Sequence, residues 1–109
     1  MGGLDEFIAG LKGFEWDEGN SAKNWLHHRV RQAEAEQALL NRPLVWARDL
    51  KHSQKEPRFL AFGRTDTKRQ LAIVFTVRGS RVRVISARPM SRAERNVYAQ
   101  AERWPEADS

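Results

Sequence analysis

The hydrophobic pattern of this chain changes its period at Pro43, and that change restricts the folds open to it. Downstream of Pro43, apolar side chains recur as in β-strands, in four runs at 43–50, 58–65, 70–79 and 81–88. The links between these runs are short, which favours antiparallel pairing between successive strands. Gly79-Ser80 is typical of a two-residue type II′ hairpin. The region therefore predicts a four-stranded antiparallel meander, with the most apolar run, 70–77, as its central strand.

The flanking segments carry helical patterns. Upstream of Pro43, we expect a short strand at 14–17 and helices at 4–13, 18–30 and 31–41. Downstream of the meander, Ser91 and Glu94 have the spacing of a capping box, which predicts a closing helix at 91–104.

The order of these elements gives the expected class. N-terminal helices, a short strand, an antiparallel sheet and a C-terminal helix make an α+β protein. A chain of 109 residues has the commonest size of one domain. We therefore expect a single domain over residues 1–109, with residues 1–13 as an N-terminal extension.

Several kinds of functional site are missing from the sequence. There is no cysteine, which excludes disulfides and cysteine-ligated zinc. The histidines are His27, His28 and His52, and no metal-binding motif, P-loop or nucleophile elbow is present. No apolar run approaches the roughly 20 residues of a membrane span, and no signal peptide is evident. We therefore expect a cytoplasmic protein without metal, cofactor or membrane association.

The charge is unevenly distributed along the chain. Residues 51–88 carry ten basic side chains against two acidic ones, a net charge of +8, so the remainder of this +5 chain has a net charge of −3. Arginine outnumbers lysine by 14 to 5, and its planar fork suits phosphate recognition. The asymmetry indicates a polyanion or an acidic partner.

Strand alternation assigns the arginines of the last strand to faces. Arg81 and Arg83 are expected on one face, where they would attract a polyanion, and Arg88 on the other, where the apolar face ends. In the second strand of the meander, Arg58 and Arg64 are expected to share a face. Adjacent strand ends could then bring arginines of separate stretches to one groove.

Aromatic side chains near this groove have two open interpretations. Phe62 or Trp46 could stack on a splayed RNA base. Such aromatic residues in strands more often belong to the core.

Five stretches occur in an order that resembles a known family. They are FEWDEGNSAKNWLHHRV at 14–30, NRPLV at 41–45, HSQKEPRFLAFGRT at 52–65, LAIVFTVRGSRVRVISAR at 71–88 and SRAERNVY at 91–98. Together they resemble the BrnT family of toxins. The resemblance implies a RelE-like fold and a ribonuclease of a type II toxin–antitoxin system that inhibits translation. It also implies three partners: RNA, a DNA-binding BrnA-like antitoxin, and operator DNA reached only through the antitoxin complex.

The resemblance also implies site residues. His52, Arg58 and Arg88 fall at the family's His…Arg-Phe…Ser-x-Arg positions and are expected to be catalytic. His52 is the candidate for proton transfer, and the two arginines are candidates for phosphate and transition-state contacts. The further RNA contacts expected are Arg64, Arg81, Arg83 and Tyr98.

Alternatives stay open at this point. Many family members have Glu-Arg where this sequence has Pro57-Arg58, so either Glu56 supplies that base or no glutamate does. A non-catalytic module that keeps the fold and binds nucleic acid or antitoxin is a second interpretation. A DNA-binding repressor acting alone fits less well, because no helix carries the row of side chains that reads a major groove.

Overall fold

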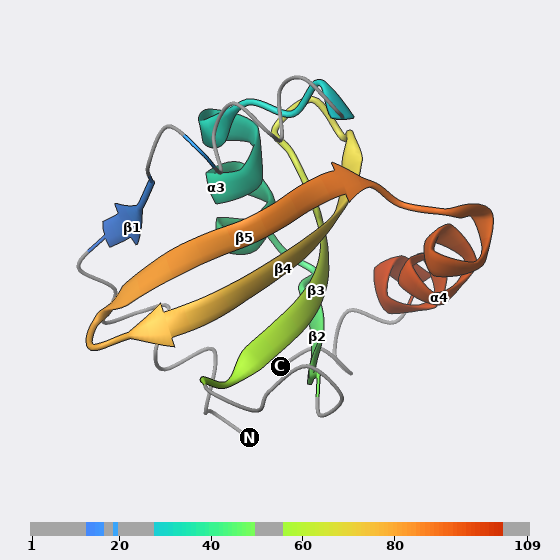
Figure 1. Cartoon of the computed structure of the whole chain (residues 1–109). Helices are drawn as coiled ribbons and strands as arrows, with labels where there is room; N and C mark the ends of the chain where they lie inside the picture. Colours follow the sequence, from blue (N-terminus) through green and yellow to red (C-terminus); the bar gives the residue numbers. More distant parts are fainter. Residues whose placement is uncertain (1–12, 17–18, 20–27, 50–55, 104–109) are drawn as a thin grey trace.

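Five strands and two helices make up the part of the chain that the computed structural model describes, residues 13–16, 19, 28–49 and 56–103 (Figure 1). In chain order they are β1 (Gly13–Glu15), α3 (Gln32–Leu40), β2 (Val45–Arg48), β3 (Arg58–Arg64), β4 (Gln70–Arg78), β5 (Arg81–Pro89) and α4 (Arg92–Arg103). The strands form one sheet in the order β1-β5-β4-β3-β2. None of these helices is long and apolar enough to cross a membrane.

The α+β class and the meander are confirmed, with a correction to the sheet. Strands β2 to β5 pair antiparallel in sequence order, and β4 is the middle strand, as the pattern predicted. The sheet is mixed, however, because β1 pairs parallel with β5 through Gly13↔Arg81 to Glu15↔Arg83. Gly13 therefore belongs to a strand and does not end a helix. The helices expected at 4–13 and 18–30 otherwise lie outside the described residues, apart from Gly19 and 28–30.

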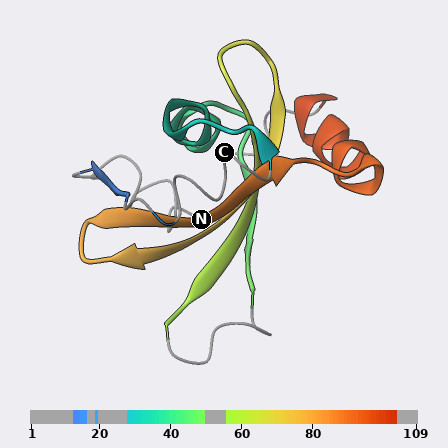
Figure 2. The ribbon, with the colours of Figure 1, turned by 45° about the horizontal axis from the view of Figure 1, so that its top comes forward.

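The β4–β5 hairpin has the geometry that its sequence predicts. Arg78 pairs with Arg81, so Gly79 and Ser80 are the two loop residues. Gly79 adopts a φ of 61°, whereas Ser80 is not among the residues with positive φ. A type II′ turn requires positive φ at its first central residue alone. Figure 2 shows this hairpin extending to one side of the strongly twisted sheet.

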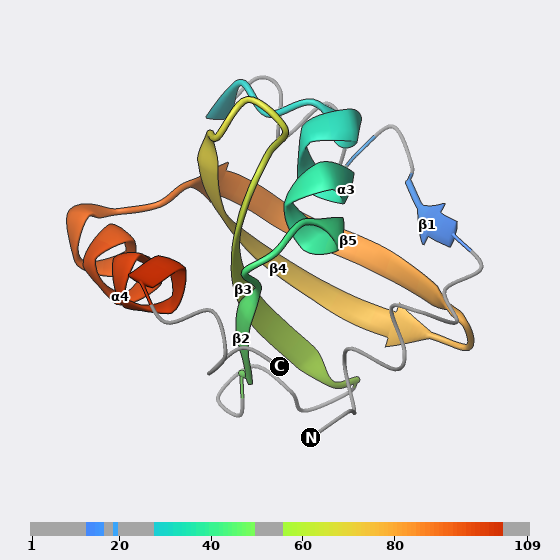
Figure 3. The ribbon, with the colours of Figure 1, turned by 180° about the vertical axis from the view of Figure 1, so that it is seen from behind.

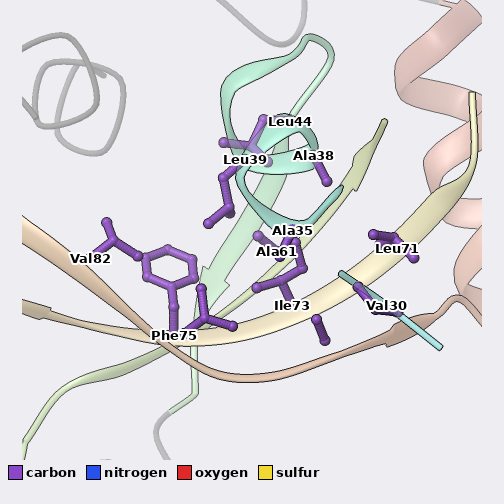
Figure 4. Close-up of a cluster of buried hydrophobic side chains, with 12 residues drawn as sticks. Val30, Ala35, Ala38, Leu39, Leu44, Ala61, Leu71, Ile73, Phe75 and Val82 are labelled. Carbon is purple, nitrogen blue, oxygen red and sulfur yellow. The ribbon is translucent and has the colours of Figure 1, made fainter. Parts of the chain in front are cut away.

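Helix α3 covers one face of the sheet (Figure 3). Its buried side chains Ala35, Ala38 and Leu39 pack on apolar residues of the strands, as Figure 4 shows. The approach is close because β3 has a glycine at the crossing. A Cβ atom on Gly63 would lie 2.1 Å from the carbonyl oxygen of Ala38. The contact thus requires glycine for space and not for backbone freedom.

Helix α4 packs on the opposite face, at one end of the sheet (Figures 1 and 2). Its buried residue is Tyr98, which clusters with Ala72 and Met90. The Tyr98 hydroxyl donates a hydrogen bond to the carbonyl oxygen of Pro43. The predicted capping box is confirmed, since the Ser91 N–H donates to Glu94 Oε1 at 2.8 Å and the Glu94 N–H donates to Ser91 Oγ at 3.2 Å.

Candidate nucleic-acid interface

A β-bulge in β5 decides which arginines share a face of the sheet. Val74 lies opposite Ser86, but the next residue of β4, Phe75, lies opposite Val84, so Ile85 is an extra residue. The bulge reverses the alternation between Arg83 and Arg88. The prediction that Arg88 lies on the face opposite to Arg81 and Arg83 is therefore wrong, because it assumed an unbroken strand.

The register of β3, β4 and β5 brings six arginines to one face. Arg58 lies opposite Thr76, and Thr76 lies opposite Arg83. Residues directly opposite each other in a sheet project to the same side. By the same register this side also holds Arg64, Arg78, Arg81 and Arg88. We call it the arginine face, and it is the face on which α4 packs, beside Leu60 and Phe62.

Arg58 and Arg83 form one row across this face with Thr76 between them. Two strand spacings separate their Cα positions, about 10 Å, which two arginine side chains can span. Thr76 is fully buried, and its hydroxyl donates a hydrogen bond to the carbonyl oxygen of Pro57. The row is thereby tied to the residue before Arg58.

Arg88 lies in a different row, opposite Ala72. Ala72 precedes Thr76 by four positions on β4, so the two rows lie about 13 Å apart along the strand. Arg58 and Arg88 thus share a face but do not lie side by side. Positive charge spread over this length suits a strand of nucleic acid with successive phosphates more than a single small anion.

Acidic residues of α4 hold two of the arginines. Arg88 donates from Nη1 to Glu94 Oε1 at 2.7 Å and from Nη2 to Glu94 Oε2 at 2.8 Å. The Arg88 hydrogen bonds lower the pKa of Glu94 to about 2, and the same hydrogen bonds raise the pKa of Arg88. At the other end of the helix, Arg64 pairs with Glu102 at 3.0 Å. Neither partner was recognised from the sequence, in which Glu94 was assigned only a capping role.

Of the two candidates for proton transfer, His52 and Glu56, the structure describes only Glu56. His52 lies outside the described residues. Glu56 forms an ion pair with Arg78 at 3.4 Å. Arg78 follows Thr76 by two residues on β4, so Glu56 lies at the same end of the arginine face as Arg58 and Arg83. Among the residues that the structure describes, no group of three or more acidic or histidine side chains could hold a metal ion.

Three aromatic candidates lie away from the Arg58–Thr76–Arg83 row. Phe62 packs in the cluster beneath α4. Trp46 is 40% exposed, but it packs edge-on against Phe59 on the α3 side of the sheet, with 6.0 Å between the ring centroids. Tyr98 is fully buried, which gives it a role in packing and leaves its side chain no surface for RNA.

Comparison with known proteins identifies the family. The model of the family described as "Ribonuclease toxin, BrnT, of type II toxin-antitoxin system" matches residues 16–94. The chain belongs to the BrnT family. The crystal structure of the Brucella abortus ribonuclease toxin BrnT matches with a TM-score of 0.54 and 24% sequence identity, over 73% of this chain and 97% of that one. At this identity the match supports the fold. No curated protein matches.

One residue shortly before α3 has a backbone conformation that favours glycine. Arg29 adopts a φ of 54°, the left-handed conformation that favours glycine. Its carbonyl oxygen accepts a hydrogen bond from Arg69 at 2.8 Å. The chain thus has an arginine in a turn whose backbone conformation favours glycine.

Proposed function

We propose that this BrnT-family toxin is an endoribonuclease whose substrate binds along the arginine face. The observation that carries the proposal is the row of Arg58 and Arg83 on either side of Thr76. Two guanidinium groups at this spacing can contact the non-bridging oxygens of one phosphate. The net charge of +8 in residues 51–88 adds a longer-range attraction for RNA.

The chemistry proposed is metal-independent cleavage by the RNA's own 2′-hydroxyl. The 2′-oxygen attacks the adjacent phosphorus, and the bond from phosphorus to the 5′-oxygen breaks. A base accepts the 2′-OH proton, and an acid protonates the departing 5′-oxygen. Arg58 and Arg83 stabilise the charge that develops on the phosphate oxygens, and Arg88 holds a phosphate further along the strand. His52 and Glu56 are the candidates for the proton transfers.

A direct assay tests this proposal. The purified chain is incubated with single-stranded RNA in EDTA, and the products are analysed for 5′-hydroxyl and 2′,3′-cyclic phosphate ends. Cleavage with these ends is the expected result. RNA binding without cleavage would favour the second candidate, a binding module that keeps the fold. Cleavage only after addition of a divalent metal would contradict the mechanism.

We further propose the biological setting that the family resemblance implies. The toxin inhibits translation in the cytoplasm, resembles RelE in fold, and is neutralised by a DNA-binding BrnA-like antitoxin. An acidic segment of the antitoxin would complement the arginine face. Co-expression with the adjacent gene should restore growth, and operator DNA should bind the complex but not the toxin alone. Binding of operator DNA by the toxin alone would instead support a repressor.

A further inference from the structure

The ion pair between Arg88 and Glu94 leaves one edge of the guanidinium available. Glu94 accepts hydrogen bonds from both terminal nitrogens of Arg88. The remaining capacity of Nη1 is directed to the carbonyl oxygen of Pro89 at 3.3 Å. Within the described part of the chain, the Nε–H and the outer N–H of Nη2 have no acceptor. These two donors lie side by side on one edge of the guanidinium plane.

That edge matches the oxygens of a phosphate. Two parallel N–H groups of arginine bind two oxygens of a phosphate bidentately, and the geometry demands a fixed plane. Glu94 fixes the plane without occupying the edge. An unpaired arginine on a surface would sample many rotamers, and binding would have to order it. Because Glu94 already orders the Arg88 side chain, RNA binding does not have to order it.

Glu94 is itself held in position by the start of α4. Its Oε1 accepts the Ser91 N–H at 2.8 Å in addition to Arg88. The carboxylate is ionised at neutral pH, and the Arg88 hydrogen bonds lower its pKa further, from 4.5 to about 2. The helix N-terminus, Glu94 and Arg88 thus form one connected unit on the arginine face.

From this arrangement we infer that Glu94 is a positioning residue for RNA binding, which holds Arg88 so that its Nε–Nη2 edge receives a phosphate of the substrate. The inference rests on the proposed function and adds a residue to it. Two other roles are possible for Glu94. It could serve only as a helix cap, or it could compete with phosphate for Arg88.

Two substitutions separate these roles. Glu94→Gln retains a residue accepted at this position of a capping box but loses the negative charge and one of the two acceptors. Ser91→Ala removes the Oγ cap and leaves the Arg88–Glu94 pair intact. Thermal unfolding, single-turnover cleavage and the salt dependence of RNA binding are measured for both variants and the wild type.

The positioning role predicts a specific combination of results. Glu94→Gln should unfold within a few degrees of wild type, cleave roughly tenfold more slowly, and show a log Kd–log salt slope smaller by about 0.7, one lost single-strand phosphate contact. Ser91→Ala should unfold at a lower temperature but retain the wild-type cleavage rate and slope. A helix cap alone would not change the slope.

Other results overturn the inference. If Glu94→Gln cleaves RNA at the wild-type rate and has the wild-type salt slope, Glu94 serves only as a helix cap. If Glu94→Gln binds RNA more tightly with a larger salt slope, Glu94 competes with phosphate for Arg88. If the wild type binds RNA without cleaving it, the proposed catalysis fails, while the slopes of the two variants still decide the role of Glu94. If the wild type neither binds nor cleaves, both proposals fail.

Discussion

Arg58 and Arg83 lie opposite the same residue, Thr76, on the two sides of the central strand of the sheet. They come from strands separated by the whole of β4, so only the register of the meander brings them into one row. Arg88, five residues after Arg83, shares their face only because of the bulge at Ile85. The position of the basic site thus depends on strand pairing as much as on the number of arginines.

The contact between α3 and β3 should make Gly63 intolerant of a side chain. In Gly63→Ala the new Cβ would meet the Ala38 carbonyl oxygen, which is backbone and cannot rotate away. We expect a loss of about 3 kcal/mol or more in the free energy of unfolding, measured with urea. Gly79→Ala is the control, since nothing lies within 4 Å of its Cβ position. Gly79→Ala should lower the free energy of unfolding by only about 1 kcal/mol, because of its positive φ. Equal losses in the two variants would contradict the close contact between α3 and β3.

The turn before α3 should be stabilised by glycine. Arg29→Gly removes the Cβ atom, whose presence strains the left-handed backbone. It also raises the conformational entropy of the unfolded chain, which costs stability. The first effect is the larger, so the net gain in unfolding free energy should be about 0.5 kcal/mol. Arg29→Ala loses the same side-chain contacts but keeps the Cβ. In urea unfolding, Arg29→Gly should be more stable than Arg29→Ala, and the reverse order would show that Arg29 is not strained.

Tyr98 should matter for stability and not for RNA. Tyr98→Phe removes the hydrogen bond to the Pro43 carbonyl oxygen and leaves that oxygen without its phenolic donor. We expect a loss of about 1–2 kcal/mol in unfolding free energy. RNA affinity at a temperature where both proteins are folded should be unchanged. A large loss of RNA affinity with an unchanged free energy of unfolding would show that Tyr98 contacts RNA.

The Arg88–Glu94 pair should give stability a defined dependence on acid. Since the folded-state pKa of Glu94 is about 2 and the usual value is 4.5, ionised Glu94 stabilises the fold above pH 4.5, and this stability is lost as the pH falls through about 2. Arg88 is 37% exposed, so solvent screening limits the contribution to about 1 kcal/mol. The difference in unfolding free energy between wild type and Glu94→Gln should shrink over this range. A constant difference would contradict the ionic contribution.

The fold was predictable from the sequence where local signals mark it. Strands β3, β4 and β5 and helix α4 begin and end within one residue of their predicted bounds, because Pro89, Gly79-Ser80 and the Ser91–Glu94 box mark the ends. The parallel pairing of β1 with β5 was not predictable. It joins residues nearly 70 positions apart, and no local pattern specifies such a pairing.

The candidate site was predictable only in part for a similar reason. Its arginines could be named from the sequence, but their arrangement depends on a bulge without a glycine to mark it. The only sign is that Ile85 directly follows Val84, which breaks the alternation of arginine and valine. Glu94 was missed as a partner of Arg88 because the sequence pattern already explained it as a cap.

The effect of removing Arg58 and Arg83 on the rate of RNA cleavage tests the central claim most directly. Single-turnover RNA cleavage in EDTA is measured for wild type, Arg58→Ala, Arg83→Ala and the double variant, with Arg48→Ala as the control. Arg48 is exposed and, by its register with Phe59, lies on the opposite face. Its substitution lowers the net charge by the same amount but does not touch the row. We expect each single variant of the row to lose roughly 100-fold, the double variant to lose less than the product of the two, and Arg48→Ala to stay within about twofold of wild type. Equal, small losses in all three single variants would show that the arginines act only through net charge and would contradict the site.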